Sequence, residues 1–211
     1  GSRRFEVLFT GPGGHSWSDF GVGNPVHALA RAVALFADAR TDTRGGAVGK
    51  SAINVGVIDG GSSVNAIAQS ARAKVDIRSE DNLKLDELVE TLEAAVDRAR
   101  EVENQRAASG KVTAKLREIG SRPAAALPDS AAILRYVRVV DGHLGIRSHL
   151  DTSSTDANIP LSLGIPAVAI GGGGTGGGAH TTQEWYRPEG RDLGLKRILL
   201  TLLLLLRGDA E

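Results

Sequence analysis

The sequence contains no cysteine and no methionine in its 211 residues. The absence of cysteine excludes a disulfide framework and a thiolate metal site, and it fits a reducing compartment such as the cytoplasm. Because translation starts at methionine, Gly1 is not expected to be the first residue of a gene product. We therefore expect the chain to be a processed or recombinant piece, or one that has lost an N-terminal part.

Neither sign of charge is in excess, since 25 lysine and arginine residues balance 25 aspartate and glutamate residues. Nucleic acid and membrane surfaces usually bind through a basic patch, so this balance supports neither partner. Long apolar runs are also scarce. Residues 198–206 form the one membrane suspect, but this run has about half of the roughly 20 residues that span a bilayer, and Arg197 and Arg207 flank it. We expect it to form a buried C-terminal helix.

Residues 1–119 show the periodicity of a complete small domain. Alternating apolar residues predict strands, and apolar residues at helical spacing predict helices. The strands are expected at 5–9, 53–57, 71–77 and 112–116, and the helices at 26–36 and 85–99. Asn24 and Pro25 supply an N-cap and a first-turn proline. The order predicts a ferredoxin-like βαββαβ fold, in which two helices pack on one face of a four-stranded antiparallel sheet.

The pattern changes after a boundary at residues 120–123. Strands and helices alternate beyond it, which is typical of an α/β layer. The helices are expected at 131–140, 159–163 and 192–207, and the strands at 145–150 and 165–170. Two short strands cannot form a covered sheet. Residues 120–211 are therefore expected to be the C-terminal part of a domain whose other strands lie upstream of Gly1. Within the first domain, residues 41–49 are expected to be a polar connection.

The stretch from Ser153 to Tyr186 carries most of the candidate chemistry. Asp156 and Asn158 precede the apolar run 165–170, and a loop of seven glycines then leads to His180. Glycine lets the backbone approach a ligand closely, and a neutral imidazole suits zinc. The segment is interpreted as one wall of a catalytic cleft. Simpler interpretations are a surface histidine, a flexible glycine linker and a helix-capping role for Asp156.

Three further candidates lie in the first domain. His15 follows Gly13 and Gly14 at a strand end, where a histidine aimed at an oxyanion, a phosphate cradle or an ordinary capped turn are all possible. Asn65 lies after a strand break and suits a turn. Arg78 ends a strand on its polar face, where it is either a solvated charge or a clamp for a substrate carboxylate.

Five motifs occur in one order along nearly the whole chain. They are Gly11-Pro12-Gly13-Gly14-His15-Ser16, the segment Ile53–Asn65 with Gly60-Gly61 and Val64-Asn65, Val75-Asp76-Ile77-Arg78-Ser79, Ser154-Thr155-Asp156-Ala157-Asn158, and Ala179-His180-Thr181 with Glu184-Trp185. This set resembles the dizinc peptidase family of aminoacylases, glutamate carboxypeptidases, tripeptidases and succinyl-diaminopimelate desuccinylases, and its tripeptidase-like branch most closely.

The resemblance implies an architecture and an activity. Residues 1–119 match the lid domain of that family, which commonly pairs to form a homodimer, and residues 120–211 match the C-terminal part of its zinc-binding α/β catalytic domain. The implied enzyme is cytosolic and binds two zinc ions, with cobalt or manganese as substitutes. It cleaves an amide bond in a small peptide or an N-acyl amino acid.

The resemblance also implies roles for individual residues. His180 matches the last metal ligand, and His15 matches the lid histidine that stabilises the tetrahedral intermediate in the active site of the partner subunit. Asn65 and Arg78 match lid residues that hold the substrate, with Arg78 at its carboxylate. The substrate-side wall near the metals is matched by Asp156, Asn158 and the glycine loop that includes Gly174.

The chain departs from the family in lacking the other zinc ligands and the general base, which come from the N-terminal half of the relatives. One histidine cannot hold a dizinc site, so the chain alone is predicted to be inactive. An alternative is a non-catalytic module for dimerisation or substrate binding, formed by pairing of the lid's edge strands. A third hypothesis is anion binding at the glycine loops.

Overall fold

The computed structural model describes residues 1–39 and 49–208, so residues 41–48 of the expected polar connection lie outside the described residues. The chain divides into two compact units, Gly1–Ala125 and Ala126–Glu211. In the first unit, β6 extends to Arg122 and Ala124 is buried, so this unit continues a few residues past the expected boundary at Gly120.

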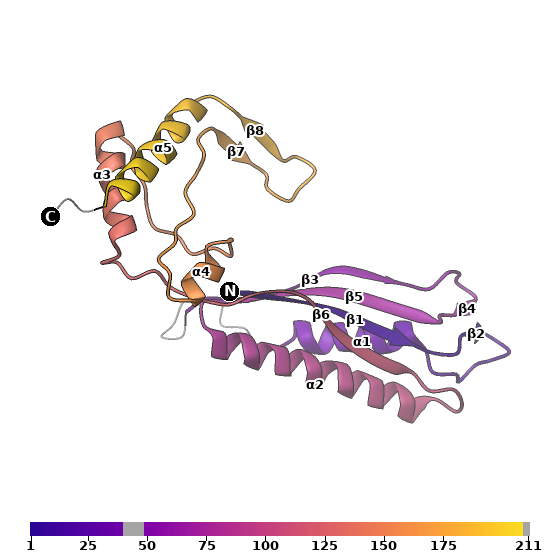
Figure 1. The fold of residues 1–211 in the computed structure, drawn as a ribbon. Helices are drawn as coiled ribbons and strands as arrows, with labels where there is room; N and C mark the ends of the chain where they lie inside the picture. Colours follow the sequence, from indigo (N-terminus) through magenta and orange to yellow (C-terminus); the bar gives the residue numbers. More distant parts are fainter. Residues whose placement is uncertain (40–48, 209–211) are drawn as a thin grey trace. The chain divides into compact units, whose positions relative to one another are not determined.

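The first unit is an antiparallel sheet with two helices on one face (Figure 1). In sheet order the strands are β3 (Ser51–Gly60), β5 (Ser70–Ser79), β1 (Ser2–Thr10) and β6 (Thr113–Arg122). The helices are α1 (Pro25–Ala37) and α2 (Asn82–Arg106). The prediction of a ferredoxin-like βαββαβ fold with a four-stranded antiparallel sheet is confirmed.

Side-chain caps fix where both helices begin. The Asn24 side chain accepts a hydrogen bond from the Val26 amide at 2.9 Å, and Asp81 accepts one from the Leu83 amide at 2.6 Å. Each bond satisfies a backbone donor that the first helical turn leaves without a partner. Asn24 is held in turn by the buried carboxylate of Glu103 on α2, which accepts from the Asn24 amide at 2.9 Å and also pairs with Arg31.

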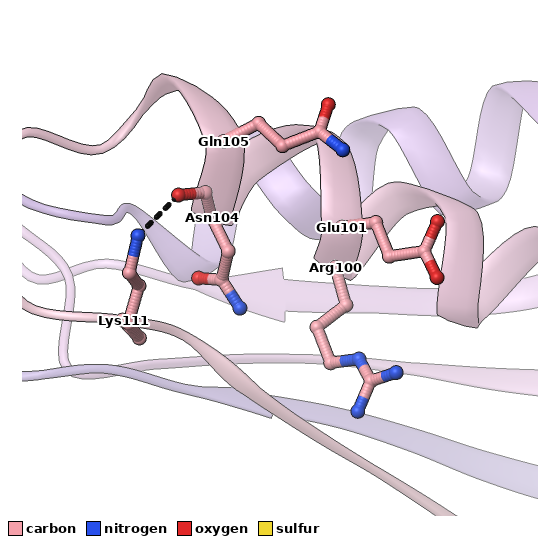
Figure 2. A pocket seen from close by; sticks show the side chains of 5 residues that line it. All are labelled: Arg100, Glu101, Asn104, Gln105 and Lys111. Atoms are coloured by element: carbon pink, nitrogen blue, oxygen red, sulfur yellow. Dashed lines mark hydrogen bonds between the residues drawn. The ribbon is translucent and has the colours of Figure 1, made fainter.

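The end of α2 is tied to the start of β6 through Asn104. Its side-chain amide donates to the carbonyl oxygen of Val112 at 2.9 Å and accepts from the Val112 amide at 2.7 Å. Lys111 donates to the backbone carbonyl of Asn104, as Figure 2 shows. A cation is favourable there because the carbonyl groups at a helix C-terminus carry partial negative charge.

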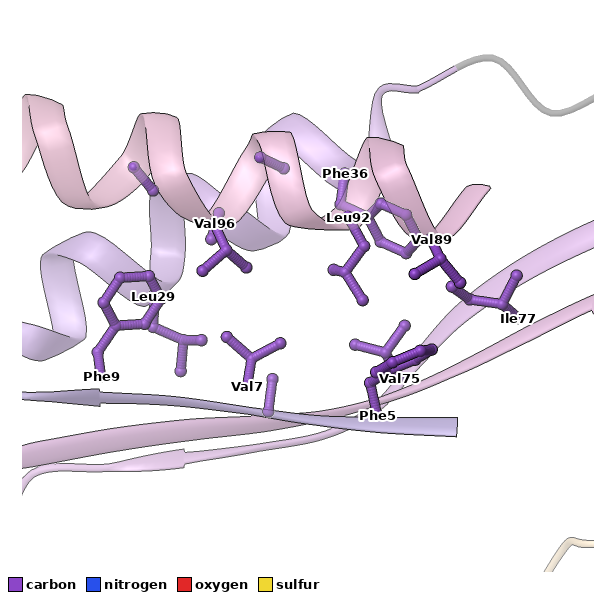
Figure 3. Close-up of a cluster of buried hydrophobic side chains, with 14 of the residues drawn as sticks. Phe5, Val7, Phe9, Leu29, Phe36, Val75, Ile77, Val89, Leu92 and Val96 are labelled. Carbon is purple, nitrogen blue, oxygen red and sulfur yellow. The ribbon is translucent and has the colours of Figure 1, made fainter. Parts of the chain in front are cut away.

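The apolar core lies between the sheet and the two helices. Figure 3 shows Phe5, Val7 and Phe9 of β1 on the same side of the sheet as Leu92 and Val96 of α2. These side chains are all nearly or completely inaccessible to solvent. Burying each such side chain contributes about 1.5–3 kcal/mol. The apolar residues that alternate along each strand are therefore the residues on the face that packs against the helices.

The opposite face of the sheet is polar and carries cross-strand ion pairs. Glu6 pairs with Arg117 at 2.9 Å, and Asp59 pairs with Arg72 at 3.2 Å. At one end of the sheet, Asp76 accepts hydrogen bonds from both Arg4 and Arg78. Neither helix lies on this face (Figure 1), and the side chains of Arg117, Arg72 and Asp59 are at least half exposed, whereas Glu6 and Asp76 are partly buried.

A small second ladder lies beyond the other end of the sheet. It pairs β2 (Gly14–His15) with β4 (Ala66–Ile67). Two-residue strands have too little periodicity to be recognised in a sequence, and the sequence analysis did not predict them.

The second unit contains three helices and one short hairpin among its described residues. They are α3 (Ala132–Leu144), α4 (Asn158–Ser162), β7 (Thr175–Gly177), β8 (Trp185–Arg187) and α5 (Arg191–Arg207). α3 and α5 pack together and are joined by a bidentate ion pair, in which Arg197 donates to the two oxygens of Asp141 at 2.6 and 2.7 Å. All three helices were predicted.

The two strands predicted in this unit are wrong. Residues 145–150 and 165–170 have no strand assignment, and Ile165 is 55% exposed. A strand needs a neighbour that accepts and donates its backbone hydrogen bonds, and the described residues of this unit offer none at these positions. Strands form instead within and just after the glycine loop, where Thr175–Gly177 pairs with Trp185–Arg187.

The prediction that residues 198–206 are helical is correct, but the prediction that this helix is buried is wrong. Only Gly194 and Thr201 of α5 are buried. Eight apolar side chains of the helix are between 39% and 75% exposed, namely Leu193, Leu195, Ile198, Leu199, Leu202, Leu203, Leu205 and Leu206. Apolar residues at helical spacing show that a helix could be buried, but they do not show that a partner is present. Among residues 126–208, no layer covers these side chains of α5. No helix of the described residues is long and apolar enough to cross a membrane.

Candidate functional site

His15 lies in a turn that fixes its backbone and leaves its imidazole exposed. The His15 amide donates to the Asp19 carboxylate at 2.6 Å, and the Asp19 amide donates back to the His15 carbonyl at 2.9 Å. The ring nitrogen Nδ1 accepts from the amides of Trp17 at 3.2 Å and Ser18 at 3.4 Å. An acceptor at Nδ1 places the proton of the neutral ring on Nε2, since a neutral imidazole has one donor and one acceptor. The turn therefore presents a single N–H donor outward.

Asn65 lies beside this turn, in a second turn that directly precedes β4. The β2–β4 ladder pairs His15 with Ala66, and the Ser16 amide donates to the Asn65 carbonyl at 2.9 Å. The Asn65 side-chain oxygen accepts from the Ser63 hydroxyl at 2.6 Å. Two of the residues singled out in the sequence, which are fifty positions apart, are thus brought to one end of the first unit (Figure 1).

Arg78 lies at the opposite end of the same sheet. Arg78 is the second-last residue of β5 and lies opposite Ser2 of β1 and Ala52 of β3. β4, which pairs with the strand that contains His15, lies before the first residue of β5, Ser70. The eight residue-to-residue steps from Ser70 to Arg78 span about 26 Å at roughly 3.3 Å per step. The first unit of one chain therefore cannot bring Arg78 and His15 to the same small ligand.

The Arg78 guanidinium is oriented by Asp76. Its Nε donates to one carboxylate oxygen at 2.6 Å, and Nε of Arg4 donates to the other at 2.8 Å. Partial burial acts to raise the pKa of Asp76, but the bonds from Arg4 and Arg78 outweigh it and leave that pKa below its usual value. Arg4 was not among the candidate residues named from the sequence. Its position opposite Asp76 depends on the register of β1 against β5, which the sequence pattern does not give.

In the second unit, Asn158 is buried. Its side-chain oxygen accepts from the Thr155 amide at 2.8 Å, and only 5% of the residue is exposed. Asp156 is exposed, and the N-cap residue of α4 is Ala157, which makes no side-chain cap bond. Both residues belong to the tight turn that starts α4.

Gly174 lies in a loop that is packed rather than free, which disfavours the linker interpretation. Its φ is 79°, and a Cβ at this position would lie 2.4 Å from the Tyr186 hydroxyl. That hydroxyl donates to the Gly173 carbonyl at 3.1 Å. A Cβ on Gly194 of α5 would lie 2.3 Å from the backbone of Gly172, so the loop rests directly on the helix. Glycine is required at both positions because any side chain would displace backbone.

His180 is the only non-glycine residue with positive φ among the described residues, at 64°. Its amide donates to Glu184 at 3.2 Å, and its imidazole is exposed. Non-glycine residues in this backbone region are uncommon, and the strain concentrates at functional sites. The β7–β8 turn thus presents a histidine in a fixed, strained position.

The described residues do not form a zinc site by themselves. Catalytic zinc takes about three protein ligands and an open position. No group of three histidine, cysteine, aspartate or glutamate side chains in residues 1–39 and 49–208 could hold a metal ion. His180 alone supplies at most one ligand, so these residues do not fit a dizinc centre.

One groove in the described residues lies at the end of α2, away from all of these candidates. It has a volume of about 430 Å³ and is lined by Arg100, Glu101, Asn104, Gln105 and Lys111 at the end of α2 (Figure 2). Arg100 pairs with Asp97 at 3.0 Å, and Lys111 is bound to the helix end. None of the residues that the sequence singled out lines this groove.

Comparisons with known proteins agree with the fold of the first unit. Residues 1–103 match the family model M20_dimer, which is described as the peptidase dimerisation domain. No curated protein matches the chain.

Several solved structures share the fold over most of the chain. A tripeptidase from Staphylococcus aureus subsp. aureus Mu50 superposes with a TM-score of 0.71 at 18% identity, over 98% of this chain and 52% of its own. An amidase of the hydantoinase/carbamoylase family from Burkholderia vietnamiensis gives 0.67 at 18% identity, over 96% and 47%. The aminobenzoyl-glutamate utilization protein from Klebsiella pneumoniae gives 0.61 at 23% identity, over 76% and 39%. The chain thus spans about half the length of the first two proteins.

Proposed function

We propose that this chain is part of an amide-bond hydrolase of the M20 peptidase family, since residues 1–103 match the M20_dimer model, which is described as the peptidase dimerisation domain. The whole enzyme would act on a small peptide or an N-acyl amino acid. Residues 1–125 would be its lid and residues 126–211 the C-terminal part of its catalytic domain. The solved structures of similar fold include a tripeptidase and an amidase, which supports this reaction class. A cytosolic location stays a prediction.

The observation that carries the proposal is the separation of the candidate residues on the lid. His15 and Asn65 lie at one end of the sheet and Arg78 at the other, about 26 Å away by strand length. A site that uses all three must therefore take them from two lids. A homodimer supplies this arrangement, with Arg78 from one subunit and the pair His15 and Asn65 from the other.

The role of His15 follows from its fixed tautomer. Nδ1 accepts from backbone amides, which leaves Nε2–H as the donor of an exposed side chain. A preorganised donor of this kind stabilises the negative oxygen that forms when an amide carbonyl is attacked. Asn65 lies close enough to His15 to contact the same substrate from the same lid. Arg78 would hold the substrate carboxylate.

Metal binding is proposed for the whole enzyme only. Because the described residues do not fit a metal centre, the remaining ligands and the general base would come from polypeptide outside these 211 residues. His180, held in a strained turn, is the one residue proposed as a ligand. The exposed apolar side of α5 is consistent with a catalytic domain whose other layer is supplied separately.

The proposal is tested by reading the gene upstream of the codon for Gly1 and expressing the longer polypeptide. We expect metal-dependent hydrolysis of tripeptides or N-acetyl amino acids, measured by release of free amine. Substituting His15→Ala should lower kcat by about 10²–10³, as for loss of one oxyanion donor. An unchanged kcat would remove His15 from the mechanism.

The matched control is the 211-residue chain assayed with added zinc, cobalt or manganese, which we expect to be inactive. Turnover by this chain that His180→Ala abolishes would show that it holds a complete site. Failure of the longer polypeptide to hydrolyse either substrate class would favour the second candidate, a dimerisation or substrate-binding module without catalysis. The lack of a metal-binding cluster among the described residues is the observation that favours this candidate.

A further inference from the structure

Two guanidinium groups share one carboxylate on the open face of the lid. Arg4 lies directly opposite Asp76 in the β1–β5 register, and Arg78 is two residues further along β5 on the same face. Each arginine donates to a different oxygen of Asp76 through its Nε. Both arginine side chains remain 49% exposed. Their Nη nitrogens have no protein partner among the described residues, so each guanidinium keeps donors for a ligand.

The balance of charge in this cluster differs from that of the other pairs on the same face. Arg72 pairs with Asp59, and Arg117 pairs with Glu6, so each of these cations is matched by its own anion. Asp76 faces two cations, which leaves the cluster with a net charge of one positive unit. If Arg4 were absent, Asp76 would neutralise Arg78 and the electrostatic attraction for an incoming carboxylate would be weaker.

The neighbouring positions leave this cluster uncovered. Gly120 lies opposite Arg4 on β6, and Ser2 and Ala52 lie opposite Arg78 on β1 and β3. The helices pack on the other face of the sheet (Figure 1). Small cross-strand neighbours and an open face let a ligand reach both guanidinium groups.

We propose that Arg4 and Arg78 together form a two-guanidinium site for an organic carboxylate, with Asp76 as the residue that orients both. The inference rests on the proposed role of Arg78 at the substrate carboxylate and adds Arg4 as a second substrate-binding residue. The ligand class is a small molecule with a free carboxylate next to an amide, such as an N-acyl amino acid or the C-terminus of a short peptide. Paired guanidinium groups suit this ligand because they offer several donors at fixed angles.

The experiment uses the 211-residue chain and the probe N-acetylglycine, with N-acetylglycinamide as the uncharged control. Binding is followed by the shifts of the arginine Nε–H signals in NMR spectra, and assignments come from the variants. We expect saturable shifts at Arg4 and Arg78 with N-acetylglycine and none with the amide. At about 5 Å in water, one unit of charge changes Kd roughly fourfold, so Arg4→Gln should weaken binding about fourfold. Arg78→Gln should weaken it by about tenfold or more, because it also removes a charge-assisted hydrogen bond.

Arg72→Gln is the matched control. It removes the same charge from the same face of the same strand, at a residue that is 50% exposed. Arg72 lies about 20 Å along the strand from Arg78, beyond a screening length of roughly 8–10 Å in physiological salt. Binding to this variant should therefore change less than about twofold. Each variant is checked for an unchanged thermal transition.

The outcomes separate this inference from the proposed function. If Arg78→Gln weakens binding and Arg4→Gln does not, the role of Arg4 is wrong and the role of Arg78 stands. If the intact chain binds N-acetylglycine no better than its amide, the carboxylate role of Arg78 fails, and the two-guanidinium site fails with it. If Arg72→Gln weakens binding as much as Arg4→Gln, the attraction is general surface charge, and the site is overturned.

Discussion

Two histidines in this chain are held in the same way. The amide of His15 donates to Asp19, and the amide of His180 donates to Glu184, so each is bound to a carboxylate four residues later. Both imidazoles stay exposed. A bond at the backbone fixes the position of the residue without using the ring nitrogens. This arrangement suits a side chain that must bind a ligand, because a residue that is already fixed loses little conformational entropy on binding.

At the residue scale, the turn around His15 predicts a role for Asp19 as a positioning residue. Substituting Asp19→Ala should release the His15 amide and loosen the contacts of Nδ1 with the Trp17 and Ser18 amides. We expect the ring to change from one tautomer to a mixture and the unfolding free energy to fall by about 1 kcal/mol, the usual net value of a hydrogen bond. Nitrogen-15 NMR of the imidazole at alkaline pH, where the ring is neutral, measures the tautomer.

Ser18→Ala is the matched control for Asp19→Ala, since it keeps the backbone amide that bonds to Nδ1. It should leave the proton on Nε2. A tautomer that stays entirely Nε2–H in the Asp19→Ala variant would show that the turn holds the ring without the carboxylate. An Nδ1–H ring in the intact chain would contradict the assignment itself.

The sequence was informative about single residues only where a motif or a turn marks them. His15, Asn65 and Arg78 follow glycine turns or end a strand, so they could be named as candidates. The joint contact of Arg4 and Arg78 with Asp76 could not be predicted. It depends on the register of β1 against β5, and a shift of one residue would move Arg4 to the other face.

At the scale of elements, the two edges of the sheet differ. β3 is uncharged from Asn54 to Ile58, and Val57 and Ile58 are 44% and 60% exposed. α1, which contacts β3, exposes Leu35. β6 carries Lys115, Arg117 and Glu118, and charged side chains discourage pairing at an edge. β3 is therefore the edge that we expect to form the proposed homodimer.

The prediction is that Ile58→Lys weakens dimerisation. A lysine on an edge strand places a charge where a second strand would pack. We expect the intact chain to sediment as a dimer and this variant to raise the dimer dissociation constant by at least about tenfold, which is roughly 1.4 kcal/mol. Sedimentation velocity over a range of concentrations measures it.

Ile119→Lys on β6 is the matched control, because Ile119 is also exposed, at 43%, on the other edge strand. It should leave the dimer intact. A dimer lost only in the Ile119→Lys variant would assign the interface to β6, and an intact chain that is monomeric at all concentrations would remove the homodimer from the proposal.

The elements of the first unit were predictable because each strand and helix has an apolar face for a core within the same unit. Residues 165–170 show why the second unit was not. Their apolar character gives no information about whether a neighbouring strand exists, and strand formation needs one. The same limit explains α5, whose periodic leucines predicted a helix correctly and its burial incorrectly.

At the scale of the whole molecule, acid should destabilise both units. Burial acts to raise the pKa of Asp141, but hydrogen bonds from Arg197 and Ser148 outweigh it and leave that pKa lowered. In the first unit, bonds from arginines likewise lower the pKa values of Glu118 and Asp76. A carboxyl group whose pKa is lower in the folded state stabilises that state above its unfolded pKa. The stabilisation is lost as the pH falls through the folded pKa. We therefore expect stability to decline from about pH 5 downward.

In the second unit, we expect the loss of stability at low pH to come from protonation of Asp141. The Asp141 side chain is only 6% exposed, and the side chain of its ion-pair partner Arg197 is 12% exposed. Asp141→Asn removes the charge and leaves Arg197 buried beside a neutral group, which should cost about 3–5 kcal/mol of unfolding free energy.

Asp129→Asn is the matched control, because Asp129 is exposed and lies in the same unit. It should change the unfolding free energy by less than about 0.5 kcal/mol. Urea unfolding followed by circular dichroism at pH 7 and pH 4 measures both variants. The Asp141→Asn variant should also lose the acid sensitivity of its own transition, because the titrating group is gone. If both variants are equally stable at pH 7, the ion pair between α3 and α5 does not hold this unit together.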